Sequence, residues 1–207
     1  PMAEDAKEAT GSMGDDTPLA VLSDKYRPLY HYFRQNFSQV TNPPIDSLRE
    51  NKVMSLKTRF GNLGNILDFS KLTKDNIYVL NSPILSNAQF EKFLKFFGNN
   101  NKVLDCTFSK DDDLETSINL LKVKSEQAVR EGIKQIILSD KNISENRMPM
   151  PMLLCIGAIN THLVKLGLRG YVSINVQTGD ALDTHSFATL IGCLLYTSPS
   201  PRDGVQS

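Results

Sequence analysis

Polar side chains that could do chemistry follow two predicted strands in the second half of the chain, residues 135–139 and 171–177. The set consists of Asp140, Thr178, Gly179, Asp180 and His185. A histidine within hydrogen-bond reach of a carboxylate can perform general acid–base catalysis. The alternative is a polar loop in which these groups cap a helix and a turn. Proximity in sequence favours that alternative, because it establishes neither the geometry nor a shifted pKa.

The thiols and an acidic cluster give no stronger signal. Cys106 and Cys155 lie in apolar runs, which predicts buried and inert thiols, since a reactive thiol needs exposure and a positive environment. An acidic cluster, Asp111, Asp112, Asp113 and Glu115, lies where a helix is expected to begin, so the helix dipole explains it without a metal. The motifs GxxxxGK[ST], HExxH and GxSxG are absent, and no GxGxxG follows a strand. We therefore predict no catalytic, cofactor or metal residue beyond the strand-end candidates.

Apolar runs alternate with amphipathic stretches from about residue 76 onward. Strands are predicted at 77–80, 103–108, 135–139 and 171–177, and helices at 86–97, 112–132, 151–166 and 183–191. Ser86 and Gln89 form a capping box, and Gly98 ends the same helix. This alternation predicts an α/β fold with repeated βα units, a mostly parallel sheet and right-handed crossovers. Ligands of such folds bind at the carboxyl ends of the strands, where the candidates lie.

Three stretches depart from this regularity. The run 171–177 alternates apolar with polar residues, so one face of this strand is expected to meet water, a polar barrel interior or another domain. Residues 45–75 carry turn signals and are expected to hold short strands or a hairpin. Between Pro28 and Asn42, apolar residues at helical spacing from Leu29 to Phe37 predict an amphipathic helix.

Composition excludes several classes of protein. The chain has 207 residues, with 23 Lys and Arg against 23 Asp and Glu, whereas proteins that bind nucleic acid or anionic membranes usually carry a basic excess. No apolar stretch approaches the ~20 residues that a membrane span requires. Three widely spaced cysteines form no disulfide framework, which favours a reducing compartment.

Both ends of the chain indicate a piece of something longer. It starts at Pro1, and its first residues lack the apolar core of a signal peptide. The prolines and serines after Gly192 predict that the last helix stops there. The string CLLYTSPSPRD resembles an in-frame translation of a sequencing adapter, so we expect residues 193–207 to be a read-through artefact, with a disordered tail as the alternative.

Several strings, read together, resemble one family. They occur in the order PMAEDAKEATGSMGDDTPLAVLS, YHYFRQNFSQVTNPPID, ILSD, PMPMLLCIGAINTHLV, LGLRGYVSINVQTGD and HSFATLIG. They closely resemble the large subunit of glutamate synthase, where its amidotransferase domain gives way to its central domain. The resemblance covers Pro1 to Gly192 and is densest from Gly14 to Leu56.

The resemblance implies a function for a longer enzyme, which makes L-glutamate from glutamine and 2-oxoglutarate in ammonia assimilation. Glutamate synthase hydrolyses glutamine at an N-terminal cysteine, passes the ammonia through an internal tunnel, and completes a reduction on an FMN barrel with an iron–sulfur cluster. These catalytic parts are expected outside this chain, which would then hold no cofactor itself. The family's central domain resembles a rudimentary, incomplete TIM barrel, in agreement with the predicted βα units.

The resemblance also divides the chain and suggests its partners. Residues 1–23 would end the amidotransferase domain and link it to the next, and residues 24–192 would be a truncated central domain. The partners would be the amidotransferase and FMN-binding domains of the same chain, with a small electron-transfer subunit or ferredoxin, and neither nucleic acid nor membrane. The compartment would be the cytoplasm, or the plastid stroma of a photosynthetic eukaryote. The electron donor, whether ferredoxin, NADPH or NADH, is left open.

Two alternative hypotheses come from other classes. The first is a stand-alone small-molecule enzyme, which requires Asp140, Asp180 and His185 to lie within hydrogen-bond reach of one another. The second is an interaction module, which requires a large exposed apolar patch.

Overall fold

The computed structural model describes residues 19–33, 45–46, 48–49, 55–61, 67 and 77–195. They fall into two compact units, one within residues 1–37 and one within residues 38–207. The first unit contains two short 3-10 helices, η1 (Ala20–Leu22) and η2 (Leu29–Tyr32).

The long amphipathic helix predicted after Pro28 is wrong. The helical turn ends at Tyr32, and Phe33 has a non-helical backbone with φ −101° and ψ 68°. No side chain caps the start of η2, and its aromatic and histidine residues have low helix propensity, so local sequence gives a longer helix little support. Phe37 lies outside the described residues.

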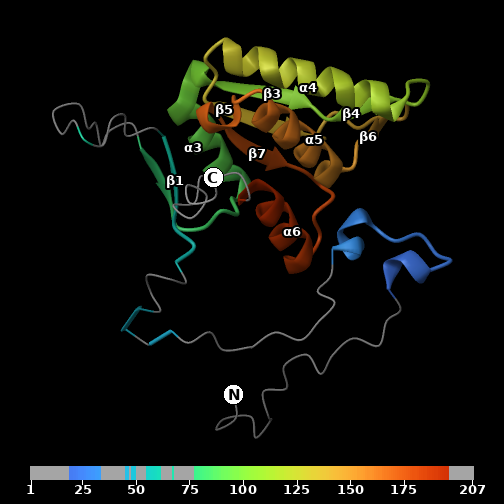
Figure 1. Cartoon of the computed structure of the whole chain (residues 1–207), viewed down its shortest axis with the longest axis horizontal. Coiled ribbons are helices and arrows are strands. Elements are labelled where there is room, and N and C mark those ends of the chain that lie inside the picture. Colours follow the sequence, from blue (N-terminus) through green and yellow to red (C-terminus); the bar gives the residue numbers. More distant parts are fainter. Residues whose placement is uncertain are drawn as a thin grey trace, which may run out of the picture. The chain divides into compact units, whose positions relative to one another are not determined.

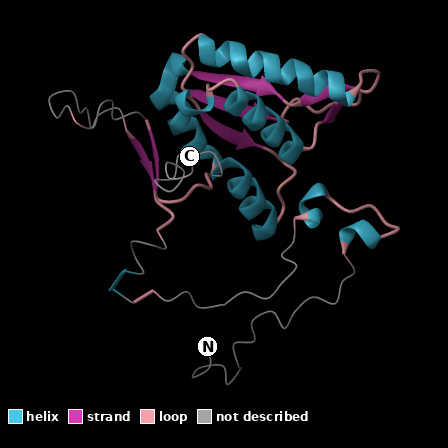
Figure 2. Cartoon of the chain, viewed as in Figure 1, coloured by secondary structure: helices cyan, strands magenta, loops and turns pink. Residues whose placement is uncertain are grey.

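The second unit alternates strands with helices, as Figures 1 and 2 show. In chain order the elements are β1 (Thr58–Phe60), β2 (Tyr78–Leu80), α3 (Asn87–Phe97), η5 (Gly98–Asn100), β3 (Asn101–Asp105), β4 (Thr107–Ser109), α4 (Leu114–Arg130), β5 (Gln135–Ser139), β6 (Arg147–Pro149), α5 (Met152–Lys165), η6 (Arg169–Tyr171), β7 (Ser173–Gln177) and α6 (Thr184–Leu195).

The central sheet is parallel and three-stranded, in the order β3-β5-β7. Ile136 of β5 pairs in register with Lys102 of β3 on one side and with Ile174 of β7 on the other. This confirms the predicted α/β class with a parallel sheet. The described strands form no closed barrel, because the four outside this sheet make two antiparallel pairs, β1-β2 and β4-β6.

Two strands differ from the predicted pattern. The run 77–80 contains β2, which pairs antiparallel with β1 and therefore does not belong to the parallel sheet. The single strand predicted at 103–108 is two strands that meet at Cys106. The N–H of Cys106 donates to Ser139 of β5, while its carbonyl accepts from Met150, so the chain changes hydrogen-bonding partners at this residue.

The helix ends follow capping rules closely. The Ser86–Gln89 capping box is present, and Gly98 ends α3 with φ +47°, a conformation that favours glycine. Asp113 accepts a hydrogen bond from the N–H of Thr116, which confirms that the acidic cluster lies at a helix start. The predicted stop of the last helix at Gly192 is wrong, since α6 continues to Leu195. The string GCLL contains no proline that would break the helix.

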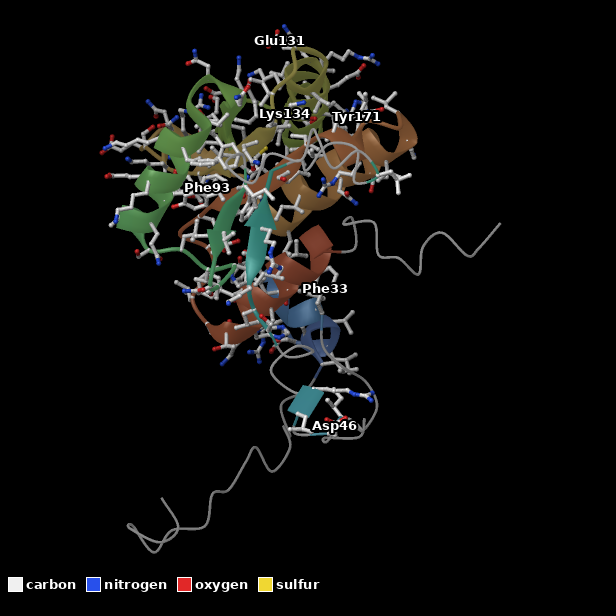
Figure 3. The ribbon with its side chains drawn as sticks, turned by 90° about the vertical axis from the view of Figure 1, so that its left-hand side faces the viewer. Phe33, Asp46, Phe93, Glu131, Lys134 and Tyr171 are labelled. Carbon is white, nitrogen blue, oxygen red and sulfur yellow. The ribbon has the colours of Figure 1, made fainter. Side chains whose placement is uncertain are left out.

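The helices cover both sides of the sheet. Figures 1 and 3 show α4 and α5 on one side and α3 on the other. The core under α4 and α5 contains fully buried aliphatic residues from β5 and α5, namely Ile136, Leu138, Ile156, Ile159 and Leu163. On α3, the buried ring of Phe93 lies 5.0 Å from Phe60 and 4.9 Å from Phe97 between centroids, so the β1-β2 hairpin is held by aromatic packing.

Candidate functional site at the carboxyl ends of the parallel strands

The three parallel strands present their carboxyl ends at one edge of the sheet. There β3 ends at Asp105, β5 at Ser139 and β7 at Gln177. Asp140 follows β5 directly, and its N–H donates to the carbonyl of Gln177 at 3.3 Å. The backbone pairing thus brings the loop after β5 beside the loop after β7.

Asp140 binds the loop after β7 through its carboxylate. The hydroxyl of Thr178 donates to Oδ2 at 2.5 Å, and the N–H of Gly179 lies 3.3 Å from Oδ1 and 3.2 Å from Oδ2. The Asp140 residue is only 6% exposed. A buried carboxylate with two internal donors joins the loops, which is a structural role.

The other two predicted residues do not join Asp140. The N–H of Asp180 donates to the Thr178 hydroxyl at 3.0 Å, and Asp180 itself is exposed. His185 lies in the first turn of α6, where its carbonyl accepts from Thr189. The hydrogen bonds of the Asp140 carboxylate go to Thr178 and Gly179. The cap of α6 is Asp183, whose Oδ1 accepts from the N–H of Ser186 at 2.7 Å.

A second carboxylate at this edge is also held by the chain. Asp105 accepts from the N–H and the hydroxyl of Thr107, from Asn142 and from Arg147. Burial alone would raise its pKa, but the bonds from Thr107 and Asn142 and the charge of Arg147 outweigh burial and lower it. Sequence reasoning missed this cluster, because Asn142 and Arg147 come from 37 and 42 residues further along the chain.

The polar residues of β7 face polar partners on β5. Asn175 donates to the side-chain oxygen of Gln135 at 2.9 Å, and the hydroxyl of Ser139 donates to Gln177 at 3.0 Å. Gln135 and Ser139 are buried. The alternation in residues 171–177, read as a face toward water, a barrel interior or another domain, thus includes side-chain pairs within the sheet itself.

The two cysteines of the core contact each other. Both Cys106 and Cys155 are fully buried. A hydrogen bond between their thiols, together with burial, raises the pKa of Cys106 far above its usual range. The Cys106 thiol is therefore protonated at neutral pH and is not a nucleophile.

A charged cluster joins two helices on the outer surface. Glu126 of α4 binds Arg130 at 2.8 Å and His162 of α5 at 3.0 Å. The bond from Arg130, followed by that from His162, lowers the pKa of Glu126. His162, one of three histidines in the chain, therefore bridges α5 to α4.

The described residues offer no set of ligands for the iron–sulfur cluster that the resemblance implies for the whole enzyme. No three His, Cys, Asp or Glu side chains of this part of the chain group as metal ligands, and an iron–sulfur cluster typically takes four thiolates. The N–H of Gly179, a group of the kind that binds phosphate, already donates to the Asp140 carboxylate. Among the helices of the described part, none combines the length and apolarity needed to cross a bilayer.

Fold and site together define a layered α/β domain whose strand-end polar groups bind one another. The family model of the glutamate synthase central domain matches residues 1–193. The chain therefore belongs to the glutamate synthase central domain family.

Curated relatives agree with this assignment. The chain is 52% identical to a glutamate synthase [NADPH] large chain of Azospirillum brasilense over 93% of its own length, and 42% identical to that of Bacillus subtilis over the same share. It is 41% identical to a chloroplastic ferredoxin-dependent glutamate synthase of Spinacia oleracea over 92%. The chain spans only 12–13% of the length of these relatives.

Proposed function

We propose that this chain is a non-catalytic part of a glutamate synthase large chain and that it holds the catalytic domains on either side of it. The observation that carries the proposal is the closed carboxyl edge of the sheet. Asp105 and Asp140, the carboxylates best placed for chemistry, both accept hydrogen bonds from the chain's own loops: Asp105 has four donors and the buried Asp140 has two. A carboxylate engaged in this way holds the loops that donate to it, which supports a structural role for both residues.

The whole enzyme would make L-glutamate from glutamine and 2-oxoglutarate. Glutamine hydrolysis, FMN and the iron–sulfur cluster would belong to the flanking amidotransferase and FMN-binding domains, which are the partners of this piece. The relatives include enzymes named for NADPH and for ferredoxin, so a small electron-transfer subunit or ferredoxin would be the further partner. The enzyme would work in the cytoplasm or in a plastid stroma. The boundaries at residues 23 and 192 are part of this proposal.

The test compares the buried, hydrogen-bonded Asp140 with the exposed Asp180 in the full-length large chain. Asp140→Asn and Asp180→Asn are assayed separately for glutamine hydrolysis and for ammonia-dependent glutamate formation, with the folded fraction measured on the same samples. We expect Asp180→Asn to leave both rates within about twofold, and Asp140→Asn to lower the folded fraction but not the rate per folded molecule.

A catalytic role would give a different pattern. Removing a general acid or base costs about 10²–10⁴-fold in rate, so such a loss in either variant at unchanged thermal stability would overturn the proposal. His185→Gln is assayed in the same way as a third variant. If Asp140→Asn fails to fold, the rates of His185→Gln and Asp180→Asn still test the proposal.

A further inference from the structure

A groove of about 490 Å³ runs beside β7, on the side away from β5. All five residues of β7 line it, from both faces of the strand, and no residue of β5 does. Its other walls are largely apolar. They include Phe60 of β1, Ile84 and Phe90, together with Phe187 and Leu190 of α6. The groove therefore follows the edge of β7.

The backbone of β7 directs hydrogen-bonding groups into this groove. The N–H of Ser173 donates to Lys134, and the carbonyl of Gln177 accepts from Asp140, so these residues face β5. In a parallel ladder alternate residues point to opposite sides, which directs the N–H and carbonyl groups of Ile174 and Val176 toward the groove. Among the described strands, β5 alone pairs with β7.

The start of this edge is already occupied. Arg169 donates from Nη1 to the carbonyl of Val172 at 2.6 Å and from Nε to Asn160 at 3.1 Å. Burial lowers the pKa of Arg169. The unpaired stretch therefore begins at Ile174. A sheet edge with open backbone groups beside an apolar groove is a template for strand addition.

The order of elements indicates which strand would add. The strands β3, β5 and β7 lie side by side in chain order, and α4 contacts α5 just as α5 contacts α6. Each βα unit thus lies next to its predecessor in the same direction. Continuation by right-handed crossovers places the strand after α6 on the open edge of β7.

The size and position of α6 agree with this continuation. Its nine residues from Thr184 to Gly192 span about 14 Å at ~1.5 Å per residue, and the five residues of β7 span about 17 Å at ~3.3 Å per residue. This part of the helix alone therefore returns the chain along most of the length of the edge. Phe187 and Leu190 line the groove, so α6 already flanks the space that the new strand would fill.

We propose that the groove receives the segment following α6 in the longer protein, as a strand parallel to β7. This rests on the proposed function, in which the chain is a piece of a large chain, and the relatives' much greater length supports such a segment. Ile174 and Val176 point to one face of the sheet and Asn175 and Gln177 to the other. The entering strand therefore carries apolar residues in register with the first pair and polar residues in register with the second.

Hydrogen exchange within β7 tests the proposal, because the control amides lie on the same strand. In the full-length large chain, we expect the amides of Ile174 and Val176 to exchange within about tenfold of those of Asn175 and Gln177. In residues 1–207 alone, we expect Ile174 and Val176 to exchange at least about 100-fold faster than these controls. Fast exchange at Ile174 and Val176 in the full-length chain would overturn the proposal.

Other occupants of the groove give other outcomes. Protection that appears in residues 1–207 together with a concentration-dependent dimer would identify a second copy, and protection of the full-length chain only after a separate protein is added would identify an external partner. Either result overturns the proposal. If residues 1–207 fail to fold, the Asn175 and Gln177 controls lose protection as well, and the full-length measurement decides alone.

A matched proline pair gives an independent readout in the full-length chain. Val176→Pro removes the N–H that faces the groove, and Asn175→Pro removes one that faces β5. Proline is tolerated on an open edge but not within a sheet, so we expect both variants to lower Tm to a similar extent. A silent Val176→Pro beside a destabilising Asn175→Pro would show that the edge stays open. Hydrogen exchange and the Tm of the proline variants do not depend on catalysis. The strand-addition proposal can therefore fail in these measurements while the proposed function stands.

Discussion

The neighbouring strands β5 and β7 are alike in length and direction but differ in burial. Each has five residues in a continuous parallel register. Every residue of β5 is buried, whereas only Ile174 of β7 is. The difference follows from position, because among the described strands β5 has a neighbour on each side, while β7 has β5 on one side and the groove on the other.

The comparison shows how a sheet accommodates polar side chains. Gln135 and Ser139 lie in the most buried strand, yet each has a side-chain partner on β7. The polar residues of β7 thus satisfy buried groups of β5 as well as facing the groove. A buried polar group with a partner is tolerated, whereas one without a partner costs roughly 1–3 kcal/mol.

The largest expected effect is a difference in lost unfolding free energy between the same substitution in β5 and in β7. Ile136 of β5 and Ile174 of β7 pair in register. Burial of Ile136 is complete, so Ile136→Ala should lose about 4 kcal/mol of unfolding free energy, because a closed cavity forms. Ile174→Ala should lose about 2 kcal/mol, since Ile174 already lines the groove. Urea unfolding of residues 1–207, in which the groove is open, measures both, and equal losses would contradict the comparison.

The next effect concerns the strand ends. Asp140→Ala should lower the unfolding free energy by about 2–3 kcal/mol, because the Thr178 hydroxyl and the Gly179 N–H lose a charged acceptor. The exposed Asp180→Ala should stay within about 0.5 kcal/mol of the parent. Thermal and urea unfolding of the two variants measure the difference. Similar values would show that the Asp140 contacts do not stabilise the loop.

A smaller effect tests the pairs between the strands. Asn175→Leu alone should lose about 1–2 kcal/mol, because Gln135 keeps its polar group without its partner. In the double variant with Gln135→Met most of that loss should be recovered, with a coupling energy of about 1 kcal/mol. A double-mutant cycle on unfolding free energies measures the coupling. Additive losses would mean that the amide pair contributes nothing specific.

The smallest effect is a pH dependence at the end of β3. The folded pKa of Asp105 lies below its ordinary 3.8, so the carboxylate stabilises the folded chain fully above pH 3.8. This stability is lost as the pH falls through the lower folded pKa, because the unfolded chain takes up the proton first. Asp105→Asn should remove this part of the acid dependence. An unchanged slope of unfolding free energy between pH 4 and pH 2 would contradict it.

Short-range rules were enough for the regular elements. The capping box at Ser86, the acidic start of α4 and the apolar run 135–139 are each complete within a few residues, and the structure confirms all three. One strand prediction was wrong because a distant partner intervened. The predicted strand 103–108 is interrupted at Cys106, where the backbone bonds turn from β5 toward Met150, and no local pattern contains that information.

The sequence by itself determined the α/β alternation, the helix caps and, through long strings, the family. Those properties depend on periodicity and on neighbours in the chain. Only the tertiary structure decided that the Asp140 carboxylate binds Thr178 and Gly179. Thr178 and Gly179 lie 38 and 39 positions from Asp140, and parallel pairing of β5 with β7 brings the three residues together. Register in a sheet is a long-range property, so it decides which candidate residues meet and which edge remains open.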